Sequence, residues 1–396
     1  MRAVVYRGAN DLRVETVPVP GIGANELLVK VAVCGVCPTD IKKIHYGTVA
    51  PPRIFGHETA GTIVKIGAGA KIRATGLKVG DRVALHHHVP CLKCHYCRHR
   101  AFAQCETYKR TGITAGFEPA GGGFAEYVRV MDFVLPGVVK IPAKNSFEEG
   151  AMLEPVNTVL KAVKRLNLLR GDNVLVAGQG PIGLMFTKIL QLRGINVLAT
   201  DLLESRLKLA KKFGAKKTLL ASQLSTINLQ LDSAIIAVPF DDAVSQALQL
   251  VRGAGQVLLF AHTKRKSSAP AVPSPAQISL AHPLSPSLSP QPGEGPGVRG
   301  ETGHLPSDSQ ALPGIQTAGP GLELDYASIC LDEKDLIGSY SSDFTIQDEV
   351  ARLVFSRRLD IRPLITHHYP LEQTTGAIAL AAKPTEKSLK IIIQQM

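Results

Sequence analysis

The sequence predicts an α/β protein in which a doubly wound parallel sheet is joined to a second, β-rich domain. Two observations lead to this prediction. Residues 1 to about 150 are rich in Val, Gly and Pro and contain short alternating runs, a pattern typical of an irregular β-barrel-like domain with many turns. From residue 147 to 167 apolar residues recur at helical spacing, and beyond that point short apolar strands alternate with helices.

The elements can be placed in order along the chain. In the β-rich part, strands are predicted at 26–33, 60–67 and 124–130. A helix over 147–167 leads to a nearly all-apolar strand at 173–177, as expected in a buried parallel sheet. The second half is predicted to contain a helix at 184–192 and strands at 196–200, 217–221, 233–238, 256–261 and 335–340, then a helix, a strand at 364–369, another helix and a last strand at 388–394.

The bulk composition limits the possible functions. A chain of 396 residues with 45% hydrophobic content can bury a large core and suggests two domains. The N-terminus lacks the apolar region of a signal peptide, and no run approaches the ~20 apolar residues that span a bilayer. We therefore expect a soluble, cytoplasmic protein without a membrane partner. The net charge of +12 is spread along the chain without a nucleic-acid motif, so a solvated surface or an anionic cofactor is favoured over nucleic acid.

One segment does not fit the α/β pattern. Residues 267–321 are rich in Pro, Ser and Gly and have no hydrophobic period. Such a composition cannot bury enough apolar surface to offset the entropy of ordering, so disorder is predicted. The segment falls between two predicted sheet strands, where a short loop is normal. It is interpreted as an insertion rather than a linker, because too little chain follows it before the last sheet strand to form a separate domain.

Four cysteines lie close together between residues 89 and 105. Their spacing is C-x2-C-x2-C-x7-C, formed by Cys91, Cys94, Cys97 and Cys105. Four thiolates packed so closely suit tetrahedral Zn²⁺, and the set leaves no open position, which indicates a structural metal. Two disulfides are the alternative, but the odd total of seven cysteines and the expected compartment favour metal ligands. Iron–sulfur clusters use similar ligands at different common spacings.

A glycine-rich turn follows the strand at 173–177. It has the form G-x-G-x-x-G, with Gly178, Gly180 and Gly183, and contains Pro181 and Ile182. Between a strand and a helix, with an acid about 20 residues later, this pattern is a dinucleotide-binding fingerprint rather than a plain Gly-rich turn. The glycines allow the tight turn, the approach of the pyrophosphate and helix–strand packing, and the helix N-terminus faces the phosphate charge.

The acid in question is Asp201, which ends the strand at 196–200. Its carboxylate is expected to accept hydrogen bonds from the adenosine ribose and to repel a 2′-phosphate, which favours NAD over NADP. Arg206 weakens the expected preference for NAD, because an arginine there could face the 2′-phosphate of NADP. The helix that carries Arg206, Lys208, Lys211 and Lys212 is otherwise expected to present a solvated face.

Three further segments carry candidate ligands for a second, catalytic metal. They contain Cys37, the pair His57 and Glu58, and Glu154. A catalytic zinc takes about three protein ligands and keeps one open position, and Cys, His and carboxylate meet that need. Each residue alone would more simply be structural or exposed. They indicate a metal site because they occur together with the four-cysteine lobe and the nucleotide fold.

At this point the chain resembles a known family, the zinc-containing medium-chain alcohol dehydrogenases, and within it the sorbitol and threonine dehydrogenase branch. The resemblance covers the chain except the insertion, and the joint pattern is specific. It implies a GroES-like catalytic domain formed by residues 1–152 and 342–396, and a Rossmann domain over 153–341. The matching pieces are VCPTD at 36–40, GHE at 56–58, the four-cysteine lobe at 89–105, GGGFAEY at 121–127, LEP at 153–155 and GQGPIG at 178–183.

The resemblance also implies roles for individual residues. Cys37, His57 and Glu154 fall at catalytic-zinc positions, and Glu58 can approach the metal or replace its water. In some polyol dehydrogenases the residue matching Glu154 acts through that water. Cys34 lacks the Ser/Thr-Asp that follows the family's ligand, so a buried small residue is expected there.

Two further positions concern the proton and the nicotinamide. Thr39 matches the hydroxyl that takes the substrate proton, and Ile182 the aliphatic residue behind the nicotinamide. Lys42 stands where several relatives have a histidine in the proton relay, and His45 is out of register. The exit route for the proton is therefore expected to differ here.

Taken together, the resemblance implies an NAD-dependent enzyme with two zinc ions per chain. It would transfer hydride between NAD and a secondary alcohol, polyol or amino alcohol, as a homodimer or homotetramer. A non-catalytic NAD-binding regulatory protein disabled by the insertion is the alternative, against which the complete ligand set argues. Zinc-free quinone reductases of the same superfamily are a weaker alternative, because they lack both sets of metal ligands.

Overall fold

The computed structural model describes residues 1–86, 89–111, 121–226, 228–261 and 326–395. The predicted disorder of residues 267–321 lies outside these ranges. In the described part of the chain, no helix has both the length and the apolar composition needed to cross a membrane.

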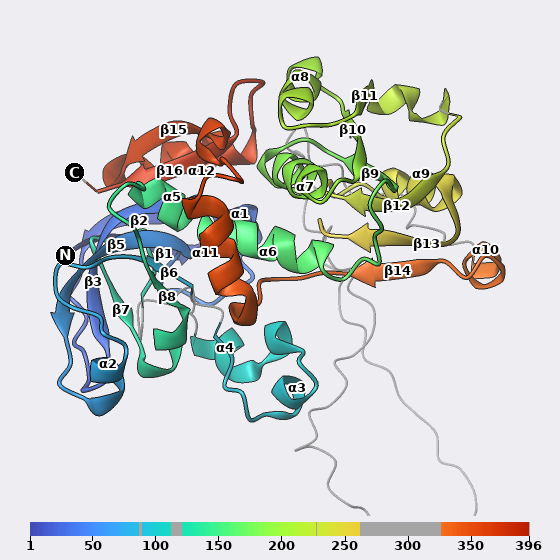
Figure 1. The fold of residues 1–396 in the computed structure, drawn as a ribbon. Coiled ribbons are helices and arrows are strands. Elements are labelled where there is room, and N and C mark those ends of the chain that lie inside the picture. The colour runs from blue at the N-terminus through green and yellow to red at the C-terminus, as the bar shows by residue number, and fades with distance from the viewer. Residues whose placement is uncertain (87–88, 112–120, 227, 262–325, 396) are drawn as a thin grey trace, which may run out of the picture. The chain divides into compact units, whose positions relative to one another are not determined.

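A six-stranded parallel sheet is formed by strands between residues 173 and 338 (Figure 1). Its strand order is β11-β10-β9-β12-β13-β14, so the order reverses beside β9. This is the doubly wound arrangement that the alternation of strands and helices predicts. The strands are β9 (Asn173–Ala177), β10 (Asn196–Asp201), β11 (Lys217–Leu220), β12 (Leu231–Ile236), β13 (Val251–Leu259) and β14 (Asp335–Gly338).

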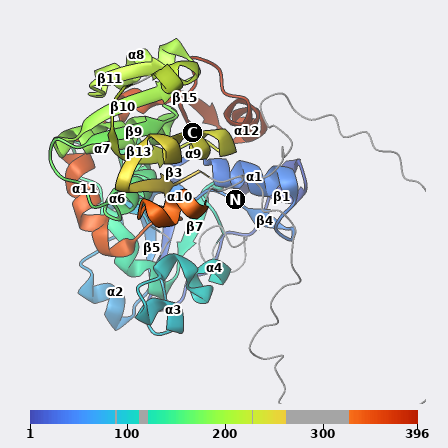
Figure 2. The ribbon, with the colours of Figure 1, turned by 90° about the vertical axis from the view of Figure 1, so that its right-hand side faces the viewer.

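Strand β9 is buried on both faces, as its apolar sequence requires. Val174 and Val176 belong to a core cluster that includes helices α6 and α7, whereas Leu175 and Ala177 belong to a second cluster that includes α9. The sheet is therefore covered by a helical layer on each face, and Figure 2 shows these helices around the strands. The helices of this part are α6 (Leu153–Val163), α7 (Pro181–Leu192), α8 (Glu204–Lys212), α9 (Asp241–Leu250) and α10 (Tyr326–Leu331).

A second, mixed sheet of seven strands joins both ends of the chain. Its order is β15-β16-β3-β5-β6-β8, with β7 also paired to β3. Strand β3 is central, because it pairs antiparallel with β5 on one side and with β16 on the other. Its strands are β3 (Leu27–Gly35), β5 (Glu58–Ile66), β6 (Arg82–Leu85), β7 (Tyr127–Val130), β8 (Val138–Lys140), β15 (Ile365–Pro370) and β16 (Lys390–Gln394).

Smaller elements surround this sheet. A three-stranded sheet, β2-β1-β4, is formed by β1 (Arg2–Gly8), β2 (Asp11–Thr16) and β4 (Arg53–Ile54). Figures 1 and 2 show the short helices α3 and α4 side by side in the cysteine-rich lobe. The remaining helices are α1 (Pro38–Tyr46), α2 (Ala70–Ala74), α3 (His95–Arg98), α4 (Glu106–Thr111), α5 (Phe147–Ala151), α11 (Gln347–Phe355) and α12 (Thr374–Ala382).

Two helix predictions need correction. The single helix expected over 147–167 is split at Met152 into α5 and α6, and α5 begins with a capping box between Ser146 and Glu149. The helix expected from residue 184 begins at Pro181, because proline is well suited to the first turn of a helix, where its missing N–H is not needed.

The prediction that Arg206 lies on a solvated face is wrong. Arg206 is 5% exposed. The side chain lies on the buried face of α8 with Leu207 and Ala210. Its Nη2 donates hydrogen bonds to the carbonyl oxygens of Thr385, at 3.1 Å, and Ser388. A buried guanidinium needs such acceptors, and they come from a loop that the local sequence pattern cannot place next to α8.

Candidate metal and dinucleotide sites

Cys37, His57 and Glu58 come together at one end of the seven-stranded sheet. Cys37 caps helix α1 after β3, and its Sγ accepts a hydrogen bond from the backbone N–H of Thr39 at 3.4 Å. Glu58 is the first residue of β5, and His57 directly precedes it. One ligand atom from each of the three residues lies within 4.8 Å of the others, and His57 and Glu58 are buried. Sulfur, imidazole and carboxylate donors at this separation fit a zinc ion.

Asp40 lies directly behind His57. Its Oδ1 is 3.2 Å from Nδ1 of His57, and the carboxylate has no exposed surface. Burial alone would lower the pKa of His57, but Asp40 and Cys37 raise it well above the usual value. A carboxylate on one ring nitrogen fixes the tautomer and leaves the other nitrogen for a metal. No local pattern in the sequence indicates this role, although Asp40 lies three residues after Cys37 within VCPTD.

Lys390 approaches the same group from the last strand. Its ammonium contacts Oε2 of Glu58 and donates a hydrogen bond to the carbonyl oxygen of Val36 at 3.0 Å. Burial would lower the pKa of Lys390, but Glu58 and Cys37 more than offset this and raise it. No motif in the sequence marked Lys390, because the contact depends on the pairing of β16 with β3.

Glu154 lies near this group without belonging to it. It stands in the first turn of α6 and is buried, but it is not one of the three residues whose ligand atoms lie within 4.8 Å. Burial raises the pKa of Glu154 to about 7; His57 opposes this shift and Glu58 adds to it. The described structure therefore places the carboxyl group within electrostatic range of the candidate metal site.

Cys34 is not a member of the group formed by Cys37, His57 and Glu58. Its Sγ lies 3.4 Å from Oγ1 of Thr59 and 3.7 Å from the carbonyl oxygen of Gly35, and burial raises its pKa to about 12. The backbone packs closely around the sulfur at two glycines, since a Cβ at Gly56 or Gly123 would lie 2.8 or 2.6 Å from it. Such surroundings suit a neutral, packed thiol rather than a ligand.

The residues expected to move a proton lie on α1. Thr39 and Lys42 both belong to this helix. Burial lowers the pKa of Lys42, and Cys37 opposes this shift only in part. Nδ1 of His45 lies 3.2 Å from Oδ1 of Asn10, in an exposed setting. The helix thus holds Lys42 near the candidate metal site and places His45 beside the turn between β1 and β2.

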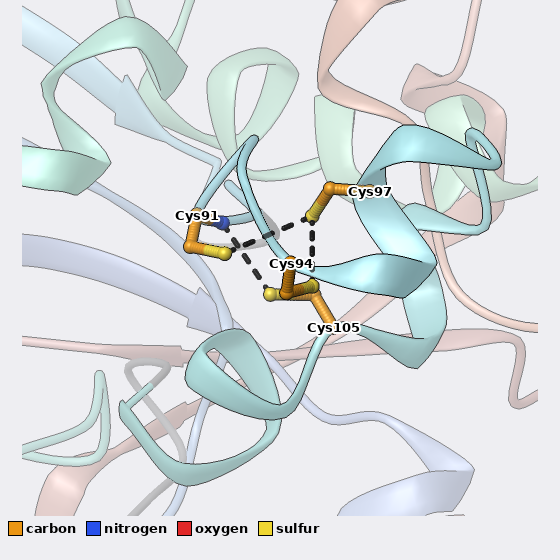
Figure 3. Close-up of side chains that lie close together, drawn as sticks. All are labelled: Cys91, Cys94, Cys97 and Cys105. Carbon is orange, nitrogen blue, oxygen red and sulfur yellow. Dashed lines mark hydrogen bonds between the residues drawn. The ribbon is translucent and has the colours of Figure 1, made fainter.

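Cys91, Cys94, Cys97 and Cys105 form a compact group of free thiols (Figure 3). The Sγ–Sγ distances are 3.4 Å between Cys94 and Cys97 and 3.9 Å between Cys91 and Cys97. Disulfide sulfurs are about 2.05 Å apart, so the disulfide alternative does not fit. Zn–S bonds of about 2.3 Å give a tetrahedron with edges of about 3.8 Å, which matches these distances.

The backbone around Cys91 favours the thiolate form of this cysteine, whereas burial raises the pKa of Cys97 to about 12. The backbone N–H of Lys93 and then that of Cys94 lower the pKa of Cys91 to about 6. The N–H of Cys91 donates in turn to Sγ of Cys105 at 3.3 Å. Backbone donors aimed at sulfur are typical of a metal-binding cysteine turn, because the thiolate is the form that binds zinc.

The three glycines of the dinucleotide turn have distinct environments. Gly178 has φ of +92°, where a side chain is strained. A Cβ at Gly183 would lie 1.7 Å from the carbonyl oxygen of Gly178, so helix α7 packs directly on the turn. A Cβ at Gly180, the N-cap of α7, would meet nothing within 4 Å. This open space in front of a helix N-terminus suits a pyrophosphate.

Asp201 lies beside this turn, at the end of β10. Its Oδ2 accepts a hydrogen bond from the N–H of Gln179 at 2.6 Å, and its Oδ1 accepts one from the N–H of Leu203 at 3.0 Å. The carboxylate is therefore fixed next to the glycine-rich turn. Arg206 donates instead to the loop before β16. Burial lowers the pKa of Arg206, and Asp201 opposes this shift only in part.

A doubly wound sheet with this glycine turn, a Cys–His–Glu group and a closed four-cysteine group is the architecture of a zinc-dependent dehydrogenase. Comparison with known protein families supports this assignment. Residues 23–143 match the alcohol dehydrogenase GroES-like domain, and residues 181–282 match the zinc-binding dehydrogenase family.

Curated relatives narrow the assignment. A sorbitol dehydrogenase of Bombyx mori is 29% identical over 410 aligned positions, covering 99% of this chain and 98% of that protein. A sorbitol dehydrogenase of Bacillus subtilis is 34% identical over 225 positions, covering 54% of this chain and 60% of that protein. The chain belongs to the zinc-containing medium-chain alcohol dehydrogenase family, in the branch that includes the sorbitol dehydrogenases.

Solved structures support the fold. An alcohol dehydrogenase from Thermus sp. ATN1 superposes with a TM-score of 0.75 at 24% identity, with 100% of both chains covered. The 2R,3R-butanediol dehydrogenase from Bacillus subtilis superposes with a TM-score of 0.73 at 22% identity, with 99% of both chains covered. At these identities the likeness shows the shared two-part architecture alone.

Proposed function

We propose that this protein is a zinc-dependent oxidoreductase that transfers hydride between NAD and a polyol or another secondary alcohol. The observation that carries the proposal is the Cys37–His57–Glu58 group, in which His57 and Glu58 are buried, within one chain that also has the glycine turn and Asp201. The sorbitol dehydrogenases of Bombyx mori and Bacillus subtilis support a polyol as substrate. The non-catalytic alternative would not need this buried ligand group.

The chemistry is divided between zinc, cofactor and protein. When bound by Cys37 and His57, zinc would supply a Lewis acid that polarises the substrate oxygen and lowers the pKa of its hydroxyl group. Asp40 orients His57 through Nδ1. Glu58 can approach the metal, and Glu154 would hold a proton or a water close to it, because its pKa is raised to about 7. The buried setting excludes bulk water and strengthens each of these electrostatic contacts.

The proton and the cofactor would be handled by separate residues. We assign Oγ1 of Thr39 to accept the substrate proton and pass it along α1, where Lys42 replaces the histidine of several relatives. Gly178, Gly180, Pro181 and Gly183 would bind the pyrophosphate, with Ile182 behind the nicotinamide.

Asp201 would accept hydrogen bonds from the adenosine ribose. Its charge favours NAD over NADP, and Arg206, held by two carbonyl oxygens, supports the same preference. In this proposal Arg206 borders the cofactor site through Asp201 rather than by facing a 2′-phosphate.

We place the catalytic domain at residues 1–152 and 342–396 and the NAD-binding domain at 153–341. The pairing of β16 with β3 supports a catalytic domain built from both chain ends. A homodimer or homotetramer is proposed, and β14 at the edge of the parallel sheet offers a surface for it. Seven cysteines without a disulfide support a cytoplasmic location.

The decisive experiment is a panel of polyols, amino alcohols and simple alcohols, assayed by NADH absorbance alongside zinc analysis of the same sample. The proposal expects two zinc ions per chain, oxidation of at least one polyol with NAD, and weaker use of NADP. A zinc-loaded protein that binds NAD but oxidises none of these compounds would favour the regulatory alternative. Equal or better use of NADP would overturn the role given to Asp201.

A further inference from the structure

A groove of about 820 Å³ lies where strand β8 and the loop after it meet helices α6, α7 and α11. Its volume is within the range of small-molecule sites. In the described part of the chain, no residue that lines it belongs to the candidate metal groups or to the glycine-rich turn. Helix α7 starts at that turn and reaches the groove with Ile189, Leu192 and Arg193 at its opposite end, roughly 15 Å away. The groove is therefore a separate site.

The floor of the groove is apolar. Six of its side chains belong to the core cluster that joins α6, α7 and α11 or pack against that cluster: Val139, Leu160, Ile189, Leu192, Leu353 and Phe355. Three of them, Leu160, Ile189 and Phe355, are buried. Because the core beneath holds these side chains in place, the floor is already formed before any ligand binds. A concave surface of this kind favours the transfer of a hydrocarbon group out of water.

Four exposed cationic side chains also line the groove. They are Lys144, Arg193, Arg352 and Arg358. Among the residues that the structure describes, none of the four side chains forms an ion pair or a hydrogen bond. The other two charged residues of the lining are paired. Lys140 lies 2.7 Å from the carboxylate of Asp81. Glu349 lies at the same distance of 2.7 Å from the ammonium of Lys164. The groove therefore presents positive charge that no carboxylate compensates.

An apolar floor combined with free cations matches a ligand that has a hydrocarbon chain and an anionic head group. Arginine side chains pair with carboxylate or phosphate through two parallel hydrogen bonds, which suits them to such a head group. A nucleotide fits less well, because its sugar and base need neutral polar partners. Ser356 is the one neutral polar side chain in the lining that the structure describes.

We propose that this groove binds a free anionic amphiphile, whose hydrocarbon chain lies on the apolar floor and whose carboxylate or phosphate pairs with Arg193 and Arg352. The inference goes beyond the proposed oxidoreductase function and does not depend on it. In the domain assignment proposed above, β8 and α11 belong to the catalytic domain, whereas α6 and α7 belong to the NAD-binding domain. A ligand in the groove would therefore contact both domains.

The first test is calorimetric titration of the full chain with dodecanoate and with dodecyl phosphate, each below its micelle concentration. We expect one saturable site per chain for at least one of the two anions, and the anion that binds more tightly identifies the head group. From octanoate to dodecanoate the affinity should rise about two- to fourfold for each methylene group, because the added carbon lies on the apolar floor. Dodecyltrimethylammonium has the same chain and the opposite charge, so it should not saturate the site. Equal affinity for this cation, or no saturable site for either anion, overturns the proposal.

The second test removes two of the cations together. Arg193→Gln combined with Arg352→Gln should weaken dodecanoate binding at least about tenfold, because the head group loses its charged hydrogen-bond donors. Both side chains are exposed, so the fold should be unaffected. Lys208→Gln combined with Lys212→Gln is the matched control, because it removes the same net charge from exposed positions of α8. The control should bind dodecanoate within about twofold of the native protein. Equal weakening in both double variants would assign the effect to overall charge and overturn the proposal.

The third test separates the groove from the candidate active site. Cys37→Ser should bind dodecanoate as the native protein does, and saturating NAD should not displace it, because the described lining of the groove contains neither candidate metal ligands nor the glycine-rich turn. Loss of binding in Cys37→Ser, or competition by NAD, would place the anion at the active site and overturn the proposal. A changed oligomeric state in the arginine double variant, without an effect on dodecanoate, would assign the groove to a contact between copies of the chain. These measurements need no turnover, so a failure of polyol oxidation leaves them unaffected.

Discussion

Nδ1 of His57 lies 3.2 Å from Oδ1 of Asp40, whose side chain has no exposed surface. Asp40→Asn keeps the shape but removes the charge that fixes the imidazole, so kcat should fall by about 10- to 100-fold with a weaker hold on zinc. Steady-state kinetics and zinc analysis check this.

Asp132→Asn is a suitable control for Asp40→Asn. Its carboxylate makes an exposed pair with Lys71 at 3.0 Å, which contributes little. Native turnover and zinc content in Asp40→Asn would show that Asp40 has no role in orienting His57.

Cys37→Ser and Cys34→Ser should behave differently although the two cysteines are three residues apart. Cys37→Ser should lose one zinc ion and all measurable turnover while the melting temperature stays close to native. Cys34→Ser should keep both zinc ions and at least about half of the activity, because Thr59 and Gly35 offer hydrogen-bond partners to a buried hydroxyl. If Cys34→Ser is inactive and Cys37→Ser is active, the ligand assignment is wrong.

Cys91→Ser should destabilise the protein, because it leaves the four-cysteine site with three thiolates. We expect zinc content to fall from two ions to one and stability to fall by at least about 2 kcal/mol, with lower solubility. Thermal unfolding and zinc analysis are the measurements. Cys330→Ser, at an exposed cysteine outside the group, is the control and should match the native protein. Unchanged zinc content in Cys91→Ser would count against a metal in the lobe.

Glu149 should stabilise the fold at neutral pH and lose this effect in acid. Burial would raise its pKa, but hydrogen bonds from Arg357, the Ser146 backbone and Asn145 hold it below the usual value. A lowered folded-state pKa gives stability that is present above the unfolded-state pKa of about 4.3 and disappears as pH falls through the folded-state pKa. Glu149→Gln should therefore cost about 1–3 kcal/mol at pH 7 and progressively less below pH 4.

Urea unfolding between pH 7 and pH 3 measures this dependence. Glu15→Gln is the control, because Glu15 forms an exposed pair with Arg7 and should matter little at any pH. A difference between Glu149→Gln and the native protein that stays constant down to pH 3 would contradict the assigned role.

Replacing residues 267–321 by a short Gly-Ser loop should preserve zinc binding, NAD binding and activity. Strands β13 and β14 pair in parallel through Leu259 and Gly338, and neither strand contains any of the replaced residues. Loop length adds only a logarithmic closure term, so the shorter connection should not destabilise the sheet. Kinetics and thermal unfolding of the deletion variant test this. A variant that unfolds would reveal a contribution of the segment to the core.

Much of the site was predictable because its signals are local. The four-cysteine spacing places its thiols on one short stretch, and Gly178, Gly180 and Gly183 lie in one turn whose neighbours are a strand and a helix. Asp201 follows at the end of the next strand. In each case the chain between the residues is short, so spacing alone restricts where the side chains can go.

The predictions that were wrong or missing depend instead on contacts between segments far apart in the chain. The burial of Arg206 depends on a loop near residue 388, and the contact between Lys390 and Glu58 depends on β3 lying between β5 and β16. The charge pattern of α8 correctly indicates a helix with many exposed lysines, but it cannot show which of its cations meets a distant carbonyl oxygen.

The sequence by itself determined the four-cysteine spacing, the dinucleotide turn and the alternation of strands and helices, because each depends on residue types at short spacings. The second set of candidate ligands, Cys37, His57, Glu58 and Glu154, is dispersed along the chain and followed from the resemblance to the family. Only the tertiary structure decided that Asp40 lies beside His57, that Glu154 stands outside the tight Cys37–His57–Glu58 group, and that Lys390 pairs with Glu58. The physical reason is strand pairing: register between segments far apart in the chain sets these distances, and local periodicity carries no information about it.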